Sequence, residues 1–204
     1  MKRSSLRPQD WLILATVAAL FFAWGAWLMR PQPPAEPLPW LVQSQEQVLR
    51  PLADDRLSLA PLAAWQEGEL WLQANPDSAR LLYRGQLGQD AEPGWSVEAE
   101  VALSEAERSS LLAAAGLDLG DGEQPLSAHL LDALGRHAIV SLTLLPPEPL
   151  DSARLAASIG PPRLTLELAE GQAWVYPELG MTAHLQDEEL FFLYVVPRHL
   201  LKQR

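Results

Sequence analysis

The chain has four histidines, the side chains best suited to binding a metal or moving a proton near neutral pH. His129, His137, His184 and His199 fall in four separate segments and lack the His-x-His or His-Glu-x-x-His spacing that brings ligands together. There is no cysteine, which excludes thiolate metal sites, thiolate nucleophiles and disulfides. The sequence therefore predicts no metal-binding residues and no cofactor.

An acidic loop over residues 116–125 offers oxygen ligands of the kind that calcium prefers. Asp118, Asp121 and Glu123 lie in this loop, but their spacing departs from the pattern of an EF-hand. We expect a solvated acidic loop.

A pair of glutamates, Glu98 and Glu100, lies two residues apart in a segment that alternates strictly between apolar and polar residues. In a strand both would point to the same face, as two catalytic carboxylates of a glycosidase would. The polar face of a half-buried strand carries the same pattern without any chemistry. We expect the second arrangement.

Other catalytic motifs are missing from the chain. Neither Gly-x-Ser-x-Gly nor Ser-x-x-Lys occurs, and the glycines match no phosphate-binding loop. The only lysines, Lys2 and Lys202, stand at the two ends. The sequence thus names no catalytic or cofactor-binding residue, and we predict that the protein is not an enzyme.

The N-terminal region has the pattern of a signal-anchor. Residues 1–10 carry Lys2, Arg3 and Arg7, and residues 11–29 contain no charge. Nineteen residues of helix span roughly 28 Å, close to the thickness of a bilayer core. The pattern predicts a single transmembrane helix over 11–29 in a bacterial inner membrane, with the basic residues 1–10 in the cytoplasm and the rest of the chain in the periplasm. The alternative is a signal peptide cleaved after Ala23-Trp24-Gly25.

A proline-rich segment over residues 30–39 follows and predicts a stiff linker. From residue 31 on, 11 basic and 25 acidic side chains give a net charge of 11 − 25 = −14. An acidic surface repels a phosphate backbone, so we expect no nucleic-acid partner.

Residues 40–204 predict one α+β domain of antiparallel strands with inserted helices. A capping box at Ser104 and Glu107 predicts the start of one helix. The expected helices are 40–50 (ended by Pro51), 105–115, 127–134 and 151–159; the expected strands are 69–75, 79–88, 95–103, 137–145, 163–168, 172–176, 181–186 and 190–196. The last four strands form a meander behind helix 151–159. Prolines at 146–150 predict a connector or a subdomain boundary.

Aromatic residues could line a ligand groove, although such residues more often fill a core. The segment Leu190–Val196 is apolar on both faces, which predicts either a central strand or an edge that awaits a partner. The aromatic candidates are Trp65, Trp71, Trp95, Trp174, Tyr176, Phe191, Phe192 and Tyr194.

These features together predict a single-pass inner-membrane protein with a periplasmic protein-binding domain. It would act as a non-enzymatic accessory or assembly factor that binds other envelope proteins and contacts the bilayer through residues 11–29. The alternative is a periplasmic inhibitor or immunity-type protein that binds an enzyme or toxin through its acidic face.

Overall fold

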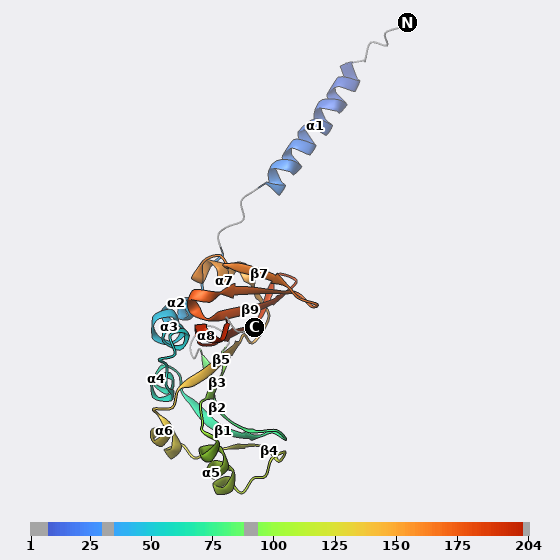
Figure 1. Ribbon diagram of the computed structural model, residues 1–204. Coiled ribbons are helices and arrows are strands. Elements are labelled where there is room, and N and C mark those ends of the chain that lie inside the picture. The colour runs from blue at the N-terminus through green and yellow to red at the C-terminus, as the bar shows by residue number, and fades with distance from the viewer. Residues whose placement is uncertain (1–7, 30–34, 88–93, 202–204) are drawn as a thin grey trace. The chain divides into compact units, whose positions relative to one another are not determined.

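The computed structural model describes residues 8–29, 35–87 and 94–201 (Figure 1). The chain divides into two compact units, Met1–Pro34 and Ala35–Arg204.

The first unit contains the helix α1, Pro8–Leu28. Its described side chains are almost all exposed, among them Trp11, Phe21 and Phe22. Among the described residues, no helix has both the length and the apolarity needed to cross a membrane. The prediction of a transmembrane helix over 11–29 is therefore not confirmed. The basic residues 1–7 and the linker residues 30–34 lie outside the described residues.

The second unit is built on one antiparallel sheet of ten strands within the described residues. The strand order is β4-β1-β2-β3-β5-β10-β9-β8-β7, and the short strand β6 pairs with β10 beside this path. The strands are β1 Gly68–Ala74, β2 Ala79–Leu87, β3 Trp95–Val101, β4 Gly122–Pro125, β5 Ile139–Leu145, β6 Leu150–Asp151, β7 Leu164–Glu167, β8 Gln172–Tyr176, β9 Met181–Gln186 and β10 Glu189–Val195.

Short helices are inserted between the strands, so the α+β class is confirmed. They are α2 Pro39–Ser44, the π-helical turn η1 Gln45–Leu49, α3 Arg50–Ala53, α4 Leu59–Trp65, α5 Glu105–Ala115, α6 His129–Leu134, α7 Ser152–Ile159, the 3₁₀ turn η2 Pro177–Leu179 and α8 Arg198–Leu201.

The helix expected over 40–50 does not end at Pro51. The chain stays helical through Ala53, and Pro51 lies in the first turn of α3. Proline cannot donate the backbone hydrogen bond of a helix interior. The π-helical turn η1 comes directly before α3 and changes the hydrogen-bond pattern at that point, so the proline is accommodated.

The hydrophobic core lies between the helices α2, α3, α4 and α7 and the inner face of the sheet. The helices contribute fully buried leucines such as Leu41, Leu52 and Leu62, and alternate residues of each strand meet them. Tyr83 of β2 is completely buried and its hydroxyl donates to the Gln66 carbonyl. Burial raises the pKa of Tyr83 to about 12, so this hydroxyl stays protonated.

Local signals in the sequence correctly located several elements. The hairpin of β1 and β2 forms around residues 75–78. Ser104 and Glu107 make the reciprocal capping box of α5, and Gly116 ends that helix with a φ of 67°. Asp151 caps α7 by accepting from the Ala153 N–H at 2.8 Å.

Alternation along 137–145 predicts a buried side made of Ala138, Val140, Leu142 and Leu144, and for β5 this is partly wrong. Val140 is only half-buried, whereas Ile139 and Ser141 are buried. The pairing of β3 with β5 shifts between Glu100 and Val101, and this irregularity reverses the alternation at the start of β5.

The C-terminal meander of β7, β8, β9 and β10 is confirmed, with each neighbouring pair antiparallel. Strand β10 also pairs with β5, so it joins the meander to the N-terminal strands in one sheet. Of the two interpretations of Leu190–Val196, the central strand is correct.

Candidate functional site

The outer face of the sheet, opposite the helical core, can be followed from strand to strand through directly paired residues. Glu98 of β3 pairs with Thr143 of β5, and Thr143 pairs with Tyr194 of β10. Tyr194 pairs with Thr182 of β9, and Thr182 pairs with Val175 of β8. Opposed residues of antiparallel strands share a face. One continuous face therefore runs from charged residues at one end to apolar residues at the other.

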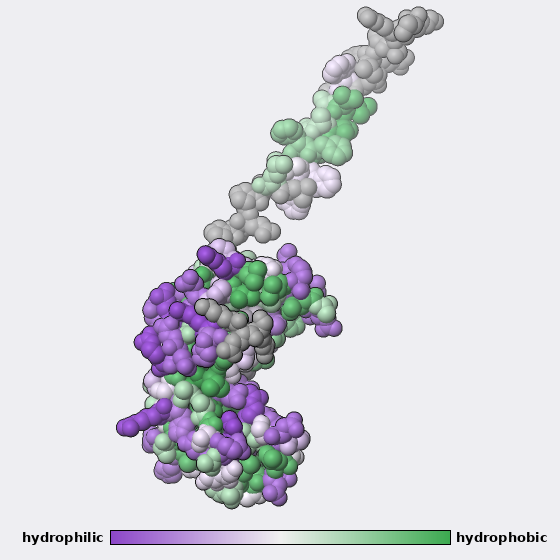
Figure 2. Space-filling view, viewed as in Figure 1, coloured by the Kyte–Doolittle hydropathy of each residue, from purple (hydrophilic) through white to green (hydrophobic). Residues whose placement is uncertain are grey.

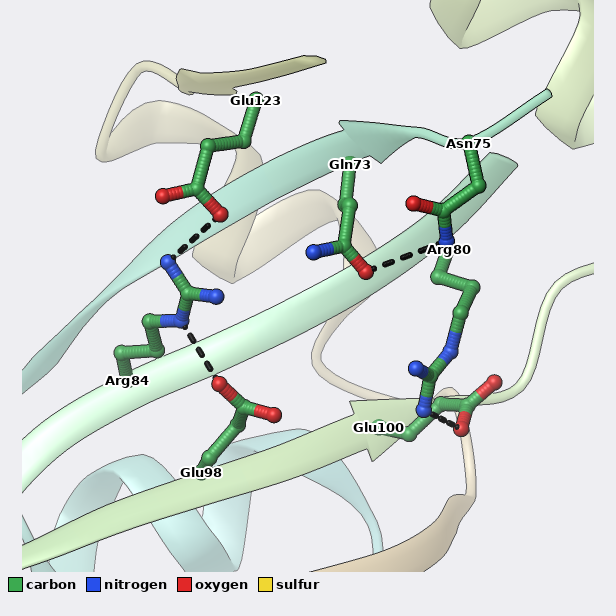
Figure 3. Close-up of polar contacts among 7 residues, drawn as sticks. All are labelled: Gln73, Asn75, Arg80, Arg84, Glu98, Glu100 and Glu123. Atoms are coloured by element: carbon green, nitrogen blue, oxygen red, sulfur yellow. Dashed lines mark hydrogen bonds and ion pairs between the residues drawn. The ribbon is translucent and has the colours of Figure 1, made fainter. Parts of the chain in front are cut away.

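The charged half of this face lies on β1 to β4 (Figure 3). Arg84 donates to Glu98 at 2.8 Å and to Glu123 at 2.9 Å, and its guanidinium lies 5.5 Å from the centre of the Trp71 ring. Arg80 pairs with Glu100, and this hydrogen bond raises the pKa of Arg80. The two arginines of β2 thus pair with three carboxylates, two on β3 and one on β4.

The prediction that Glu98 and Glu100 share a face is confirmed by their register. The sequence analysis missed the arginines that bind them. A signal was present, because Arg80 and Arg84 lie four residues apart in one strand and must therefore share a face. The neighbouring strand could have been recognised as their partner.

The acidic loop 116–125 contains an unexpected strand. β4 pairs with β1 at the edge of the sheet, and this places Glu123 beside Arg84. Asp121 turns toward its own loop and accepts from the Asp118 backbone N–H at 2.7 Å. Within the described part of the chain, no group of three or more His, Asp or Glu side chains is arranged to hold a metal ion.

The four histidines lie on different segments of the fold. His137 precedes β5 and its Nε2 lies 2.9 Å from Oε1 of Glu107 at the start of α5. The pKa of Glu107 is lowered to about 2, first by its hydrogen bonds from Ser104 and then by His137. His129 begins α6, and His199 lies in α8.

The apolar half of the outer face forms a groove of about 850 Å³. It is floored by β7, β8, β9 and β10 and bordered by α8. Several of its leucines are about half exposed, with Leu164 at 51%, Leu166 at 44% and Leu200 at 38%. Figure 2 shows hydrophobic residues interrupting the polar surface near β7. The lining consists of Leu164, Leu166, Val175, Pro177, Thr182, His184, Tyr194, Val196, Leu200 and Leu201.

Three side chains give the groove a polar component: Thr182, His184 and Tyr194. The His184 ring stacks on Phe192 with ring centres 4.2 Å apart. Burial lowers the pKa of His184, which favours the uncharged imidazole. An apolar wall with a few polar groups is the usual composition of a binding site.

The aromatic candidates divide between the two faces of the sheet. Trp95 and Tyr176 are buried on the core side, and Trp95 packs edge-on against Trp40 with ring centres 4.7 Å apart. Trp71 lies on the outer face under Arg84, and only Tyr194 lines the groove. The aromatic residues therefore form no single ligand surface.

The chain matches no protein-family model, no curated protein and no solved structure in the comparisons with known proteins.

Proposed function

We propose that the second unit is a non-enzymatic protein-binding module and that its groove on β7 to β10 holds an apolar segment of another envelope protein. The observation that carries the proposal is the groove itself, where exposed leucines surround a few hydrogen-bonding groups. Burying Leu164, Leu166 and Leu200 against a partner would remove apolar area from water, which is the main favourable term in association.

The distribution of charge supports the groove as the binding surface. Glu98, Glu100 and Glu123 already have arginine partners within the chain. Exposed carboxylates that already have such partners gain little from a new ionic partner. This internal pairing gives no support to the alternative in which an acidic face blocks a basic active site.

The proposal places the module in the periplasm, attached to the inner membrane through residues 11–29. This part rests on the sequence alone, on the uncharged segment and the basic residues before it. Its test is separate. The full chain should stay with the membrane fraction in alkaline carbonate, and a chain exported without residues 1–34 should be released.

The groove is tested by photo-crosslinking in cells. A photoreactive residue replaces Thr182 in the groove, and in a second strain it replaces Ser96, which is exposed on β3 at the charged half. We expect one specific protein to be linked from position 182 and not from position 96, as identified by mass spectrometry.

A matched pair of variants controls the test. Leu200→Glu introduces a charge at the border of the groove, whereas Leu119→Glu makes the same change at an exposed leucine between α5 and β4. Leu200→Glu should abolish the crosslink and Leu119→Glu should keep it. A crosslink that survives Leu200→Glu would refute the groove as the binding site. A soluble partner that still binds the chain lacking residues 1–34 would favour the alternative, in which the protein is a periplasmic inhibitor.

A further inference from the structure

A second cavity of the second unit, which we call the arginine cavity, has a volume of about 460 Å³. Three arginines from separate segments line it: Arg50 at the start of α3, Arg163 in the bend before β7, and Arg198 at the start of α8. Such a gathering is unexpected in a chain with a net charge of −11, and it makes the cavity a candidate site for an anion. The other lining residues are Gln45, Ile159, Pro161, Tyr176, Pro177, Glu178 and Leu179.

Arg163 is the arginine whose charge is least compensated. Its side chain is exposed and makes no hydrogen bond or ion pair among the residues that the structure describes. Its backbone N–H donates to the Val175 carbonyl at 3.0 Å, and this bond ties the bend that carries the side chain to β8. All the N–H donors of the guanidinium are therefore available to a ligand.

The other two arginines are partly engaged. Arg198 donates through Nη2 to Asp54 at 2.8 Å and through Nε to the Glu178 backbone carbonyl at 3.0 Å, which holds its guanidinium in place. Arg50 pairs with Glu46 at 3.1 Å, but the two side chains are 53% and 70% exposed. Such an exposed pair contributes little to stability, so an anion in the cavity can replace Glu46 at Arg50 at little cost. Among the described lining residues, Glu178 is the one carboxylate against three arginines.

Hydrogen bonds between its walls hold the arginine cavity together. The Tyr176 hydroxyl at the end of β8 donates to the Gly160 carbonyl at 3.3 Å, and the Gln45 side-chain amide donates to the Ser158 carbonyl of α7 at 3.3 Å. The turn η2 contacts both α3 and α8. Gln45 also begins the π-helical turn η1, a rare form of helix that is frequent at functional sites. Walls that are fixed before a ligand arrives reduce the entropy lost on binding.

A phosphate group fits three arginines better than a carboxylate does. The two oxygens of a carboxylate lie in one plane, and a single guanidinium can bind both. The oxygens of a phosphate are arranged tetrahedrally, so they can accept from several guanidiniums at once. The cavity is also larger than a bare phosphate ion, and Ile159, Pro161 and Tyr176 offer apolar surface to the rest of a small molecule.

We propose that the arginine cavity binds a phosphate group through Arg50, Arg163 and Arg198. The phosphate belongs either to a small soluble phosphate ester or to a lipid head group, and the test distinguishes these two sources. The site goes beyond the function proposed above, because the lining residues described for the arginine cavity and for the groove have only Pro177 in common.

The test is calorimetric titration of the full chain in a nonionic detergent and a buffer without phosphate. Glycerol 3-phosphate represents a soluble phosphate ester, and glycerophosphoglycerol represents the head group of phosphatidylglycerol without its acyl chains. At least one of the two should bind saturably at one site per chain, and the tighter ligand identifies the source. Glycerol, which lacks the phosphate, should not bind. The absence of saturable binding by both phosphates would refute the proposal.

Variants locate the binding site. Arg163→Gln removes the unpaired guanidinium and should weaken binding about tenfold, because hydrogen bonds between charged groups are the strong ones. Arg163→Lys keeps the charge without the planar fork and should give an intermediate affinity. Arg50→Gln tests a second wall and should also weaken binding. The matched control is Arg136→Gln, which makes the same change at an exposed arginine outside the cavity and should bind as the wild type does.

The outcome is separable from a defect in folding. Because the Arg163 side chain has no hydrogen bond or ion pair to lose within the described residues, Arg163→Gln should keep the wild-type midpoint of urea unfolding. Equal weakening by Arg163→Gln and Arg136→Gln would show only a general attraction of anions to positive charge and would overturn the proposal. Wild-type affinity in Arg163→Gln would overturn it as well.

Discussion

The two halves of the outer sheet face present different kinds of side chain to water. On β1 to β4, arginines and glutamates from different strands bind one another and cover the surface with paired charges. On β7 to β10, leucines and the half-buried Tyr194 line an apolar groove. Since both halves share one sheet and one core, the difference lies only in the outward side chains. The fold therefore does not require the outer face of β7 to β10 to be apolar.

The largest expected effect tests whether the two halves form one cooperative unit. Leu193 of β10 is fully buried and pairs with Leu144 of β5 where the halves join. Leu193→Ala should lower the free energy of unfolding by about 2–5 kcal/mol through lost burial and a cavity. Urea unfolding of residues 35–204, which contain every buried core residue of the described chain, measures it.

The control for that variant is Leu164→Ala on β7, where the side chain is half exposed. This change should cost less than about 0.5 kcal/mol. A wild-type unfolding curve with two separate transitions would contradict a single cooperative sheet, and the comparison would then concern two independent domains.

An intermediate effect is expected at the charged half. Arg84→Met removes both ion pairs of Arg84 and its contact with Trp71. We expect a loss of about 1 kcal/mol in the free energy of unfolding, because partly exposed pairs contribute little individually. The loss should shrink at high salt, which screens the pairs in the wild type.

The matched control is Arg108→Met, which removes a single exposed pair with Glu105 on α5. It should cost no more than about 0.5 kcal/mol. If Arg84→Met and Arg108→Met lose the same free energy of unfolding, the cross-strand pairs of Arg84 stabilise the charged half no more than one exposed pair does, which would contradict this prediction.

The smallest expected effect is a difference in how the stability contributed by each half depends on pH. Burial lowers the pKa of His184 in the groove, so the unfolded chain binds its proton more readily than the folded chain. The stability that His184 contributes is present above pH 6.5 and is lost as the pH falls below it. In the His184→Gln variant, the midpoint of urea unfolding should lose this part of its dependence on pH.

Glu107, on the helix α5 that packs against β1 and β2, responds in a different range. Its pKa is lowered to about 2 from an ordinary value of 4.5. The stability it contributes is therefore present above pH 4.5 and is lost as the pH falls toward 2. Glu107→Gln should remove the loss in acid and leave the change near pH 6.5 intact. Identical pH profiles for the two variants would contradict this separation.

Much of the fold could be predicted because its signals are local. The turn at 75–78, the capping box at Ser104, the cap at Asp151 and the alternation of β3 each depend on neighbouring residues. The short strand β4 and the helix α4 were missed, since their few residues carry no periodic pattern of their own. Strand β4 forms because β1 has an edge free for pairing, and no local sequence pattern indicates that edge.

The candidate sites were predictable only in part. Alternation correctly placed Glu98 and Glu100 on one outward face, but the arginines that neutralise them come from the next strand. The groove was missed entirely, since its lining comes from four strands and a C-terminal helix.

The sequence by itself determined the class of the fold, the ends of its capped helices and the antiparallel order of its last four strands. Only the tertiary structure decided that β10 pairs with β5, which makes one sheet of two groups of strands. Hydrophobic period and turn chemistry act over a few residues, so they can be deduced from the chain alone. Pairing between strands that are distant in the sequence depends on which surfaces meet in the folded chain. That pairing decided which outward side chains form ion pairs on β1 to β4 and which line the groove on β7 to β10.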